Sequence, residues 1–446
     1  MRRPYIAAVA IAVLLCPLAA RAQPLADRVP ADAIVYLGWA GAQTPVPGYA
    51  GSHLQVVIDN SKIPELGSRF LPQIFQKFAE KEPDAAEPLR IAQALWATTW
   101  KHPTALFFAG VDTSDPKNIA PRLGFICSAG ADSAAMKKEI DDLLVAAANA
   151  PFPVRAVDAD GLVGVVVGYD DPAKALASQG GGAIAKAAGF ASAMKQVQAE
   201  PVLIAYVDFE KLINMAESHV QAEADEHTKQ MVPKVIDALG IRGLKRVICT
   251  AGFDGQDWMT QTFVEAPAPR KGMLAMFDGK PVSPELLKAI PADATFVATG
   301  RFDPAKLVNT VRAVAAEIDP HLAQMIDQGL GAAQLALAKN LVTEIFEPLG
   351  EDWALYCSPS IAGNGVLGVV VVNRLDDPAK AQASLPTAAI NLSNWLGVVM
   401  KETEAEVEIR GRLTKIDDLD IYYVGLPIVA PSWAIKDGFL YMGLYT

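Results

Sequence analysis

The sequence predicts an α+β protein in which mostly antiparallel sheets are packed by helices. Apolar runs joined by Asp-Gly or Asn-Gly are typical of tight hairpins, because these dipeptides accept positive φ angles. Such dipeptides stand at 160–161, 254–255, 364–365 and 437–438. Between the hairpins, apolar residues recur with a helical period. The expected helical segments are 62–97, 132–149, 183–198, 208–239, 304–347 and 377–401.

A tetrapeptide, Asp-Pro-Ala-Lys, occurs three times, starting at Asp171, Asp303 and Asp377. Each copy follows an apolar run and precedes a helix-like stretch. An Asp before a helix accepts hydrogen bonds from the first free backbone amides, and a Pro at the next position has no amide proton to leave unpaired. We therefore expect three helix N-caps, and a repeated unit of hairpin, strand and capped helix.

A second repeated phrase predicts two related halves. Pro30-Ala31-Asp32-Ala33 precedes one expected strand, and the same four residues return at 291–294 before another. The stretch 267–271 is rich in Pro and lacks an apolar period, which is typical of a linker. We expect an N-terminal half at 23–270 and a C-terminal half at 271–446.

An apolar stripe marks the start of the segment 304–347. Leu307, Val311, Val314 and Ile318 recur at three- and four-residue spacing before Pro320 interrupts the pattern. We expect this helix to pack on a sheet.

The first residues have the order of a secretory signal peptide. Arg2 and Arg3 precede an apolar stretch, and Ala20-Arg21-Ala22 forms a small-residue cleavage site, so residues 1–22 are expected to be removed. Lipidation at Cys16 and an uncleaved anchor are the alternatives. No later apolar run approaches the ~18 residues that span a bilayer. We expect a secreted or periplasmic protein with no membrane span after cleavage.

The charge balance disfavours nucleic acid as a partner. The formal net charge is −11, and the expected signal peptide carries three arginines and no acidic residue, so the mature chain is more acidic still. A phosphate backbone is bound by concentrated Lys and Arg, whereas here the basic residues are scattered. The expected partner is an unknown envelope or extracellular ligand.

Three cysteines remain after signal removal, at Cys127, Cys249 and Cys357, and all lie in strand-like apolar runs. A thiol in such a run usually behaves as a small hydrophobic group. The sequence favours free buried thiols, with one disulfide or one reactive nucleophile as alternatives.

The best metal candidates are His219, Glu223 and His227, which are spaced four apart and share one face if the helix is continuous. The surrounding segment is densely charged, which is typical of a solvated helix surface. We therefore expect no metal, and treat the three residues as weak candidates.

Other short patterns have structural explanations. Ser192 and Lys195 match the Ser-x-x-Lys of penicillin-recognising enzymes without the accompanying Lys-Thr-Gly strand. The glycines at 180–182 are not preceded directly by a strand, as a phosphate loop requires, and 158–161 suits a hairpin better than a calcium loop. We assign no catalytic residue, no cofactor-binding residue and no cofactor.

Tryptophans offer one further possibility, which is stacking on carbohydrate. Trp96 and Trp100 share a helical face and are expected to pack in the core. Trp39 and Trp433 lie beside turns rich in Gly or Pro and are the better surface candidates.

The Pro-Ala-Asp-Ala phrases, together with the motifs at 243–255 and 270–274, resemble an uncharacterised family of secreted bacterial α+β proteins, a domain of unknown function, over most of the mature chain. The resemblance implies export and an α+β fold, and supplies no catalytic residues. The sequence favours a non-enzymatic binding or structural protein. The alternative is a secreted hydrolase with a site assembled from distant residues. A cleft with convergent titratable groups would favour the hydrolase, and an apolar groove without them would favour binding.

Overall fold

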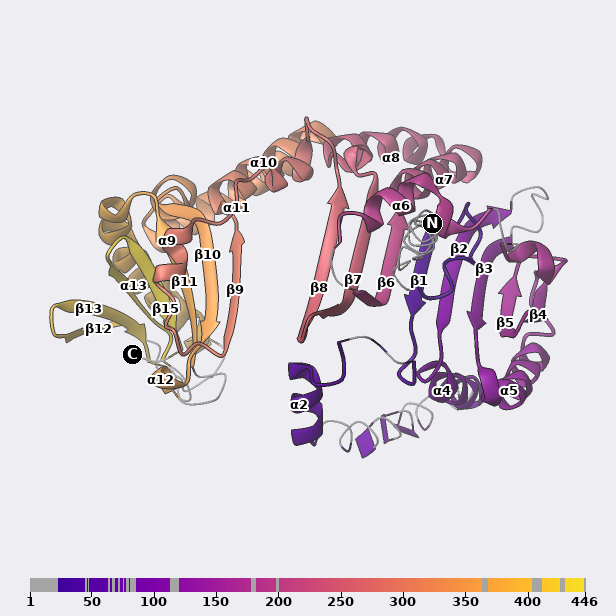
Figure 1. Ribbon diagram of the computed structural model, residues 1–446. Helices are drawn as coiled ribbons and strands as arrows, with labels where there is room; N and C mark the ends of the chain where they lie inside the picture. Colours follow the sequence, from indigo (N-terminus) through magenta and orange to yellow (C-terminus); the bar gives the residue numbers. More distant parts are fainter. Residues whose placement is uncertain are drawn as a thin grey trace, which may run out of the picture. The chain divides into compact units, whose positions relative to one another are not determined.

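The computed structural model forms two compact units, the first comprising Met1–Glu223 and Leu244–Ala266 and the second Ala224–Gly243 and Pro267–Thr446 (Figure 1). The boundary expected near residue 270 stays a prediction. The structure describes residues 23–44, 46, 48–62, 65, 69–70, 73–74, 76–77, 80, 86–112, 120–177, 182–197, 200–362, 368–402, 411–425 and 430–444. The signal peptide expected at 1–22 lies outside these residues.

The first unit is built on an eight-stranded sheet in which every neighbouring pair is antiparallel. Its order across the sheet is β4 (Val154–Ala159), β5 (Leu162–Val167), β3 (Ala120–Cys127), β2 (Thr104–Asp112), β1 (Val35–Trp39), β6 (Glu200–Asp208), β7 (Arg246–Asp254) and β8 (Asp257–Glu265).

The two faces of this sheet are covered differently. On one face, α6 (Ala188–Met194) brings Phe190 against Tyr36 and Tyr206, with ring centroids 5.6 and 5.1 Å away in edge-to-face geometry. On the other, α5 (Ser133–Ala146) buries Met136 and Ile140 over the β4–β5 side. The unit also contains α2 (His53–Asn60), α4 (Ala86–Thr99) and α7 (Phe209–Glu223).

The second unit is built on a seven-stranded sheet that is also antiparallel throughout. Its order is β12 (Gly411–Ile416), β13 (Leu419–Val424), β14 (Ser432–Lys436), β15 (Phe439–Gly443), β11 (Val369–Leu375), β10 (Leu349–Cys357) and β9 (Phe296–Arg301).

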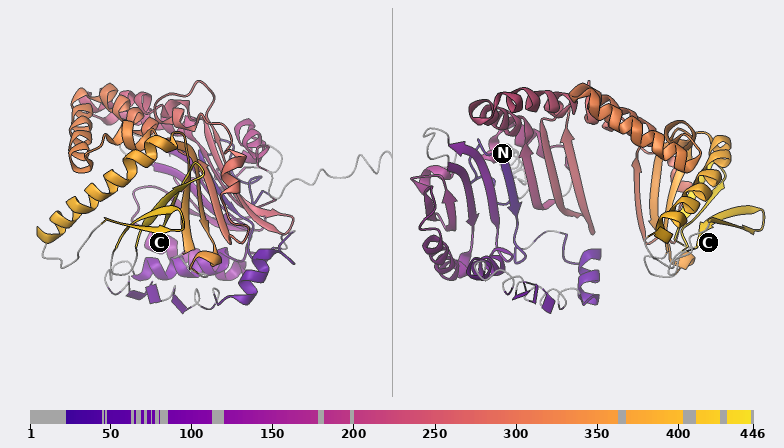
Figure 2. Two further views of the ribbon diagram at one scale, coloured as in Figure 1. Left: turned by 90° about the vertical axis from the view of Figure 1, so that its left-hand side faces the viewer. Right: turned by 180° about the vertical axis from the view of Figure 1, so that it is seen from behind.

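Helices pack on both faces of the second sheet. Leu286 of α9 (Pro284–Lys288) is buried against Tyr356 and Val372 on one face. On the other face α13 (Pro378–Glu402) packs Ala381 against Leu440 (Figure 2). The remaining helical segments are α8 (Glu226–Ala238), η5 (Ile241–Gly243), η6 (Gly272–Phe277), α10 (Pro304–Ile318), α11 (Pro320–Leu337), the π-helix η7 (Leu341–Phe346) and α12 (Pro359–Ala362).

The predicted α+β class and antiparallel sheets are confirmed, and so are the described hairpins. Asp160 and Gly161 have φ angles of 54° and 75° between β4 and β5, and Asp437 and Gly438 have 52° and 81° between β14 and β15. Gly255, at 62°, turns β7 into β8. The turn expected at 364–365 lies outside the described residues.

All three predicted N-caps are confirmed. The Asp303 carboxylate accepts a hydrogen bond from the Lys306 amide at 2.8 Å, and Asp377 accepts one from the Lys380 amide at 2.9 Å. Asp171 caps only the four-residue 3₁₀ helix η3 (Pro172–Ala175). This helix stops because Ala177 donates its amide to the Arg28 carbonyl, which draws the chain into an extended path.

Three expectations for helices need correction. The segment 208–239 is not one helix, because it breaks between α7 and α8, where Asp225 adopts an extended conformation and caps α8. The segment 304–347 divides into α10, α11 and η7. Helix α10 packs on α11, α8, η6 and η7 rather than on a sheet, and of its apolar stripe Val314 is buried whereas Val311 is 37% exposed.

The expectation of two related halves is not confirmed. The order β1-β2-β3-β5-β4 of the first unit does recur as β9-β10-β11-β15-β14 in the second. Both Pro-Ala-Asp-Ala phrases also make the same turn, with Ala33 bonded to Pro30 and Ala294 to Pro291 at 3.1 Å. However, β1 pairs with β6 on its other side, whereas β9 is an edge strand. The units therefore share an arrangement without being equal repeats.

Candidate functional site

The structure does not place the three weak metal candidates on one helix. His219 and Glu223 lie on α7, which ends at Glu223, and His227 lies in the first turn of α8. Asp225 between them accepts hydrogen bonds from the His227 and Thr228 amides, both at 3.0 Å. Within the described part of the chain, no group of three or more His, Cys, Asp or Glu side chains is arranged to hold a metal ion.

The other short patterns lie on the surface or in turns. Ser192 and Lys195 are both exposed, in the last turn and at the C-cap of α6. Asp158 pairs with Lys137 at 2.7 Å, and Asp160 with Arg28 at 3.0 Å, so both carboxylates at this hairpin are engaged. Glycines 180 and 181 lie outside the described residues.

Cys127, Cys249 and Cys357 form no disulfide with one another, as the sequence favoured, although only one of them is fully buried. Cys127 is buried, and Cys249 and Cys357 are half-buried. Burial raises the pKa of the Cys127 thiol, and a hydrogen bond with Thr104 opposes this only in part. A raised pKa suppresses the reactive thiolate. Cys127 is therefore a structural group.

The expectation that Trp96 and Trp100 pack in the core is wrong. Their side chains are 59% and 48% exposed. The i, i+4 spacing brings Trp96 in the last turn of α4 next to Trp100, which directly follows that helix, and Trp39 at the end of β1 stacks on Trp100.

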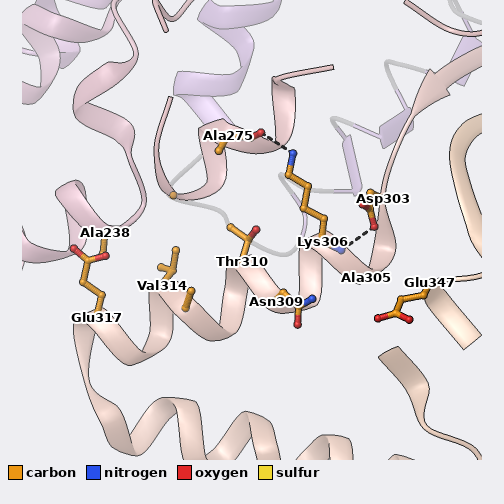
Figure 3. Close-up of a pocket in the computed structure, with 12 residues that line it drawn as sticks. Ala238, Ala275, Asp303, Ala305, Lys306, Asn309, Thr310, Val314, Glu317 and Glu347 are labelled. Carbon is orange, nitrogen blue, oxygen red and sulfur yellow. Dashed lines mark hydrogen bonds between the residues drawn. The ribbon is translucent and has the colours of Figure 1, made fainter. Parts of the chain in front are cut away.

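A groove of about 590 Å³, which has four charged side chains in its lining, runs along α10 in the second unit. Figure 3 shows its lining residues along one side of the helix, from Asp303 at the start to Glu317 near the end, with Lys306 extending toward Ala275 of η6. Glu347 approaches from beyond η7.

Three of the four charged side chains that line this groove, all except the exposed Glu317, serve structural contacts. Asp303 caps α10, and the Lys306 ammonium donates to the Ala275 carbonyl oxygen at 3.1 Å. Glu347 pairs with Lys380 at 3.4 Å. An acid–base site requires groups directed at a common point where a substrate can react. These contacts instead direct the side chains to the helix terminus, to η6 and to α13.

A second pocket, of about 370 Å³, is almost entirely apolar. It lies where the end of α11, η7, α13 and the β14–β15 hairpin meet. Among the residues that the structure describes, its lining contains no Asp, Glu, Lys, Arg or His, and Ser432 supplies the one side-chain hydroxyl. The lining residues are Leu337, Leu341, Ile345, Leu385, Ala388, Ala389, Leu392, Pro431, Ser432, Trp433, Leu440, Met442 and Gly443.

An apolar stripe on α13 and the π-helix η7 supply much of the lining of this pocket. Leu385, Ala388, Ala389 and Leu392 recur at helical spacing, so α13 presents one apolar face that has two small residues at its centre. The small side chains leave room that larger ones would fill. π-helical turns are often found at functional sites, and here η7 contributes Leu341 and Ile345.

Polar contacts hold the walls of the pocket in place. The Asn391 amide of α13 donates to the Leu337 carbonyl oxygen at 2.9 Å, tying α13 to the end of α11. Asn340 caps η7 through the Val342 and Thr343 amides. A hydrogen bond from the Asn340 amide and the neighbouring Lys339 hold the pKa of Glu344 below its ordinary value, so this carboxylate is fixed outside the pocket.

The sequence identified only one member of this pocket in advance, since Trp433 was singled out as a surface candidate. In the structure Trp433 is half-buried, lines the pocket and stacks on Tyr422 with centroids 5.7 Å apart. The stripe on α13 was a visible signal, but a stripe does not show whether its face is filled by a neighbour.

Fold and pocket together define an antiparallel α+β protein with an apolar pocket of ligand size. The residues 177–394 match the model of a family described as protein of unknown function (DUF3352). This confirms the resemblance to an uncharacterised family, although over a shorter stretch than most of the mature chain. No curated protein and no solved structure matches the chain. Among the described residues, no helix combines the length and apolarity that crossing a membrane requires.

Proposed function

We propose that the protein is an exported, non-enzymatic binding protein of the cell envelope or extracellular space, and that the pocket at α13 binds an uncharged apolar ligand. The observation that supports this most is the lining of the pocket, in which no described residue has a titratable side chain. The alternative of a secreted hydrolase finds less support, because Asp303, Lys306 and Glu347 of the α10 groove are engaged in capping and packing contacts, which leaves Glu317 without a second charged group directed at the same point.

The size of the pocket limits the ligand. A cavity of about 150 Å³ holds one benzene molecule, and typical ligand pockets begin at about 300 Å³. At about 370 Å³ the pocket suits a medium-length alkyl chain or a two-ring molecule. Leu392, which is 40% exposed, marks its solvent side. A single polar head on the ligand can therefore remain in water while the chain is buried.

A series of n-alkanols tests this function. Each buried CH₂ contributes about 0.8 kcal/mol, so affinity should rise about fourfold per carbon until the pocket is full, and then level off. Displacement of a neutral fluorescent naphthylamine from the full-length protein measures it.

The chain offers a matched pair of variants on one helix. Ala389→Phe fills the pocket and should abolish binding of the probe, whereas Ala383→Phe places the same side chain at an exposed position of α13 and should leave binding unchanged. Affinities that ignore chain length, or equal binding by both variants, would contradict the proposal.

A further inference from the structure

Three tryptophans of the first unit form a continuous stack that the apolar pocket does not involve. The Trp39 and Trp100 rings lie 4.7 Å apart at an angle of 20°, and the Trp100 and Trp96 rings lie 5.9 Å apart at 29°. Trp39 is half-buried at the end of β1, while Trp96, at the outer end of the stack, is the most exposed of the three. The stack therefore extends from the end of β1, a central strand of the sheet, into solvent.

Hydrogen bonds hold the inner end of the stack. The Trp39 indole donates its Nε1 proton to the Trp100 carbonyl oxygen at 2.9 Å, and the Ala42 amide donates to the same oxygen at 2.8 Å. Trp39 is thus tied to the backbone of Trp100, whose ring packs between Trp39 and Trp96.

Lys101 and His102 directly follow Trp100 in the chain, and both contact Asp132. His102 Nε2 lies 2.9 Å from Asp132 Oδ2, and the Lys101 ammonium lies 3.8 Å from the same oxygen. The hydrogen bond from His102 lowers the pKa of Asp132, so its half-exposed carboxylate stays ionised and can accept further hydrogen bonds. Exposed flat aromatic rings bordered by such groups suit a ligand that has both C–H faces and hydroxyls.

The net charge of the chain favours a neutral ligand over an anionic one. The chain carries a net charge of −11, which opposes contact with an anionic membrane surface or a polyanion. A neutral sugar chain has no such penalty. Its pyranose rings present C–H groups that can meet the electron-rich face of an indole. Its hydroxyls can pair with the carboxylate and ammonium groups beside the stack.

We propose that the Trp39–Trp100–Trp96 stack is a binding platform for neutral pyranose oligosaccharides. Trp96 offers its outer ring face to a sugar, Trp100 and Trp39 support that ring from behind, and we assign Asp132 and Lys101 to the hydroxyls of the sugar. This site lies in the first unit and is independent of the apolar pocket in the second.

Titration of the full-length protein with cellohexaose and with the hexamer of β-1,4-linked N-acetylglucosamine, followed by calorimetry, tests the platform. At least one of them should bind, and Trp96→Ala should weaken that binding about tenfold, equivalent to about 1.4 kcal/mol. Trp96→Phe keeps an aromatic face and should lose less. Trp395→Ala removes a tryptophan of similar exposure from α13 in the other unit, and should bind as the unmodified protein does.

Binding of neither sugar would overturn the proposal. An equal affinity for Trp96→Ala and the unmodified protein would overturn it as well. So would Trp96-dependent binding to neutral phosphatidylcholine vesicles without binding of either sugar, because this would identify a lipid surface as the occupant. Far-ultraviolet circular dichroism checks that each variant is folded, and the exposure of Trp96 makes that the expected result.

Discussion

Replacing Asp303 with Ala should destabilise the second unit by about 1 to 2 kcal/mol. Asp303 precedes the 15-residue helix α10, and its carboxylate accepts the Lys306 amide proton at 2.8 Å. Loss of an N-cap side chain costs about 0.5 to 2 kcal/mol. The carboxylate also lies at the positive end of the helix dipole, and that interaction contributes about 0.3 to 1 kcal/mol. Because Asp303 is only half-buried, we expect no added cavity cost.

Equilibrium unfolding in urea, followed by circular dichroism, measures the change in the free energy of unfolding. Asp303→Asn is the matched control, because Asn caps as well as Asp and removes only the charge, so it should cost less than about 1 kcal/mol. Asp171→Ala should cost less than Asp303→Ala, because η3 has four residues. Equal losses for Asp303→Asn and Asp303→Ala would refute the capping explanation, as would no loss for either.

Three further predictions concern ionisation, thiols and export. Hydrogen bonds, the larger effect from Ser358 and the smaller from Ser360, lower the pKa of Asp293 from its ordinary 3.8. The stability that this carboxylate contributes is therefore present above pH 3.8 and is lost as the pH falls through the lower pKa of the folded state. Ser358→Ala should raise the Asp293 pKa measured by NMR, and an unchanged pKa would count against this explanation. In native protein, a disulfide-exchange reagent should modify buried Cys127 more slowly than half-buried Cys249 and Cys357, and peptide mass spectrometry measures the three rates. Equal rates would contradict the assignment of Cys127 as a buried structural thiol. The exported protein should begin at Gln23, and a lipidated start at Cys16 would contradict cleavage after Ala22.

The features that could be predicted from the sequence are determined by neighbouring residues. The three Asp caps and the Asp-Gly turns need only a few residues of chain, and in each described case the local chemistry produced the expected geometry. The hairpin at Asp417, which has a φ of 51°, was missed because Asp-Asp is a weaker turn signal than Asp-Gly.

What the sequence could not predict depends on contacts between distant segments. The apolar stripe of α10 predicts that this helix packs against a neighbour, but not that the neighbours are helices such as α11 and α8 instead of a sheet. The exposure of Trp96 could not be predicted for the same reason, because an apolar helical face does not show whether a distant segment covers it. The apolar pocket combines residues from Leu337 to Gly443, and its volume depends on where α13 lies against β15, which no local pattern specifies.

The position of a bound ligand tests the central claim most directly, and Trp433 provides the probe. A brominated alkanol quenches the fluorescence of an indole that it touches, so binding in the pocket should quench the protein and should lose most of that effect in Trp433→Phe. Trp395→Phe, altered on the exposed side of α13, should be quenched as the unmodified protein is. Quenching that persists unchanged in Trp433→Phe would place the ligand elsewhere and contradict the assignment of this pocket.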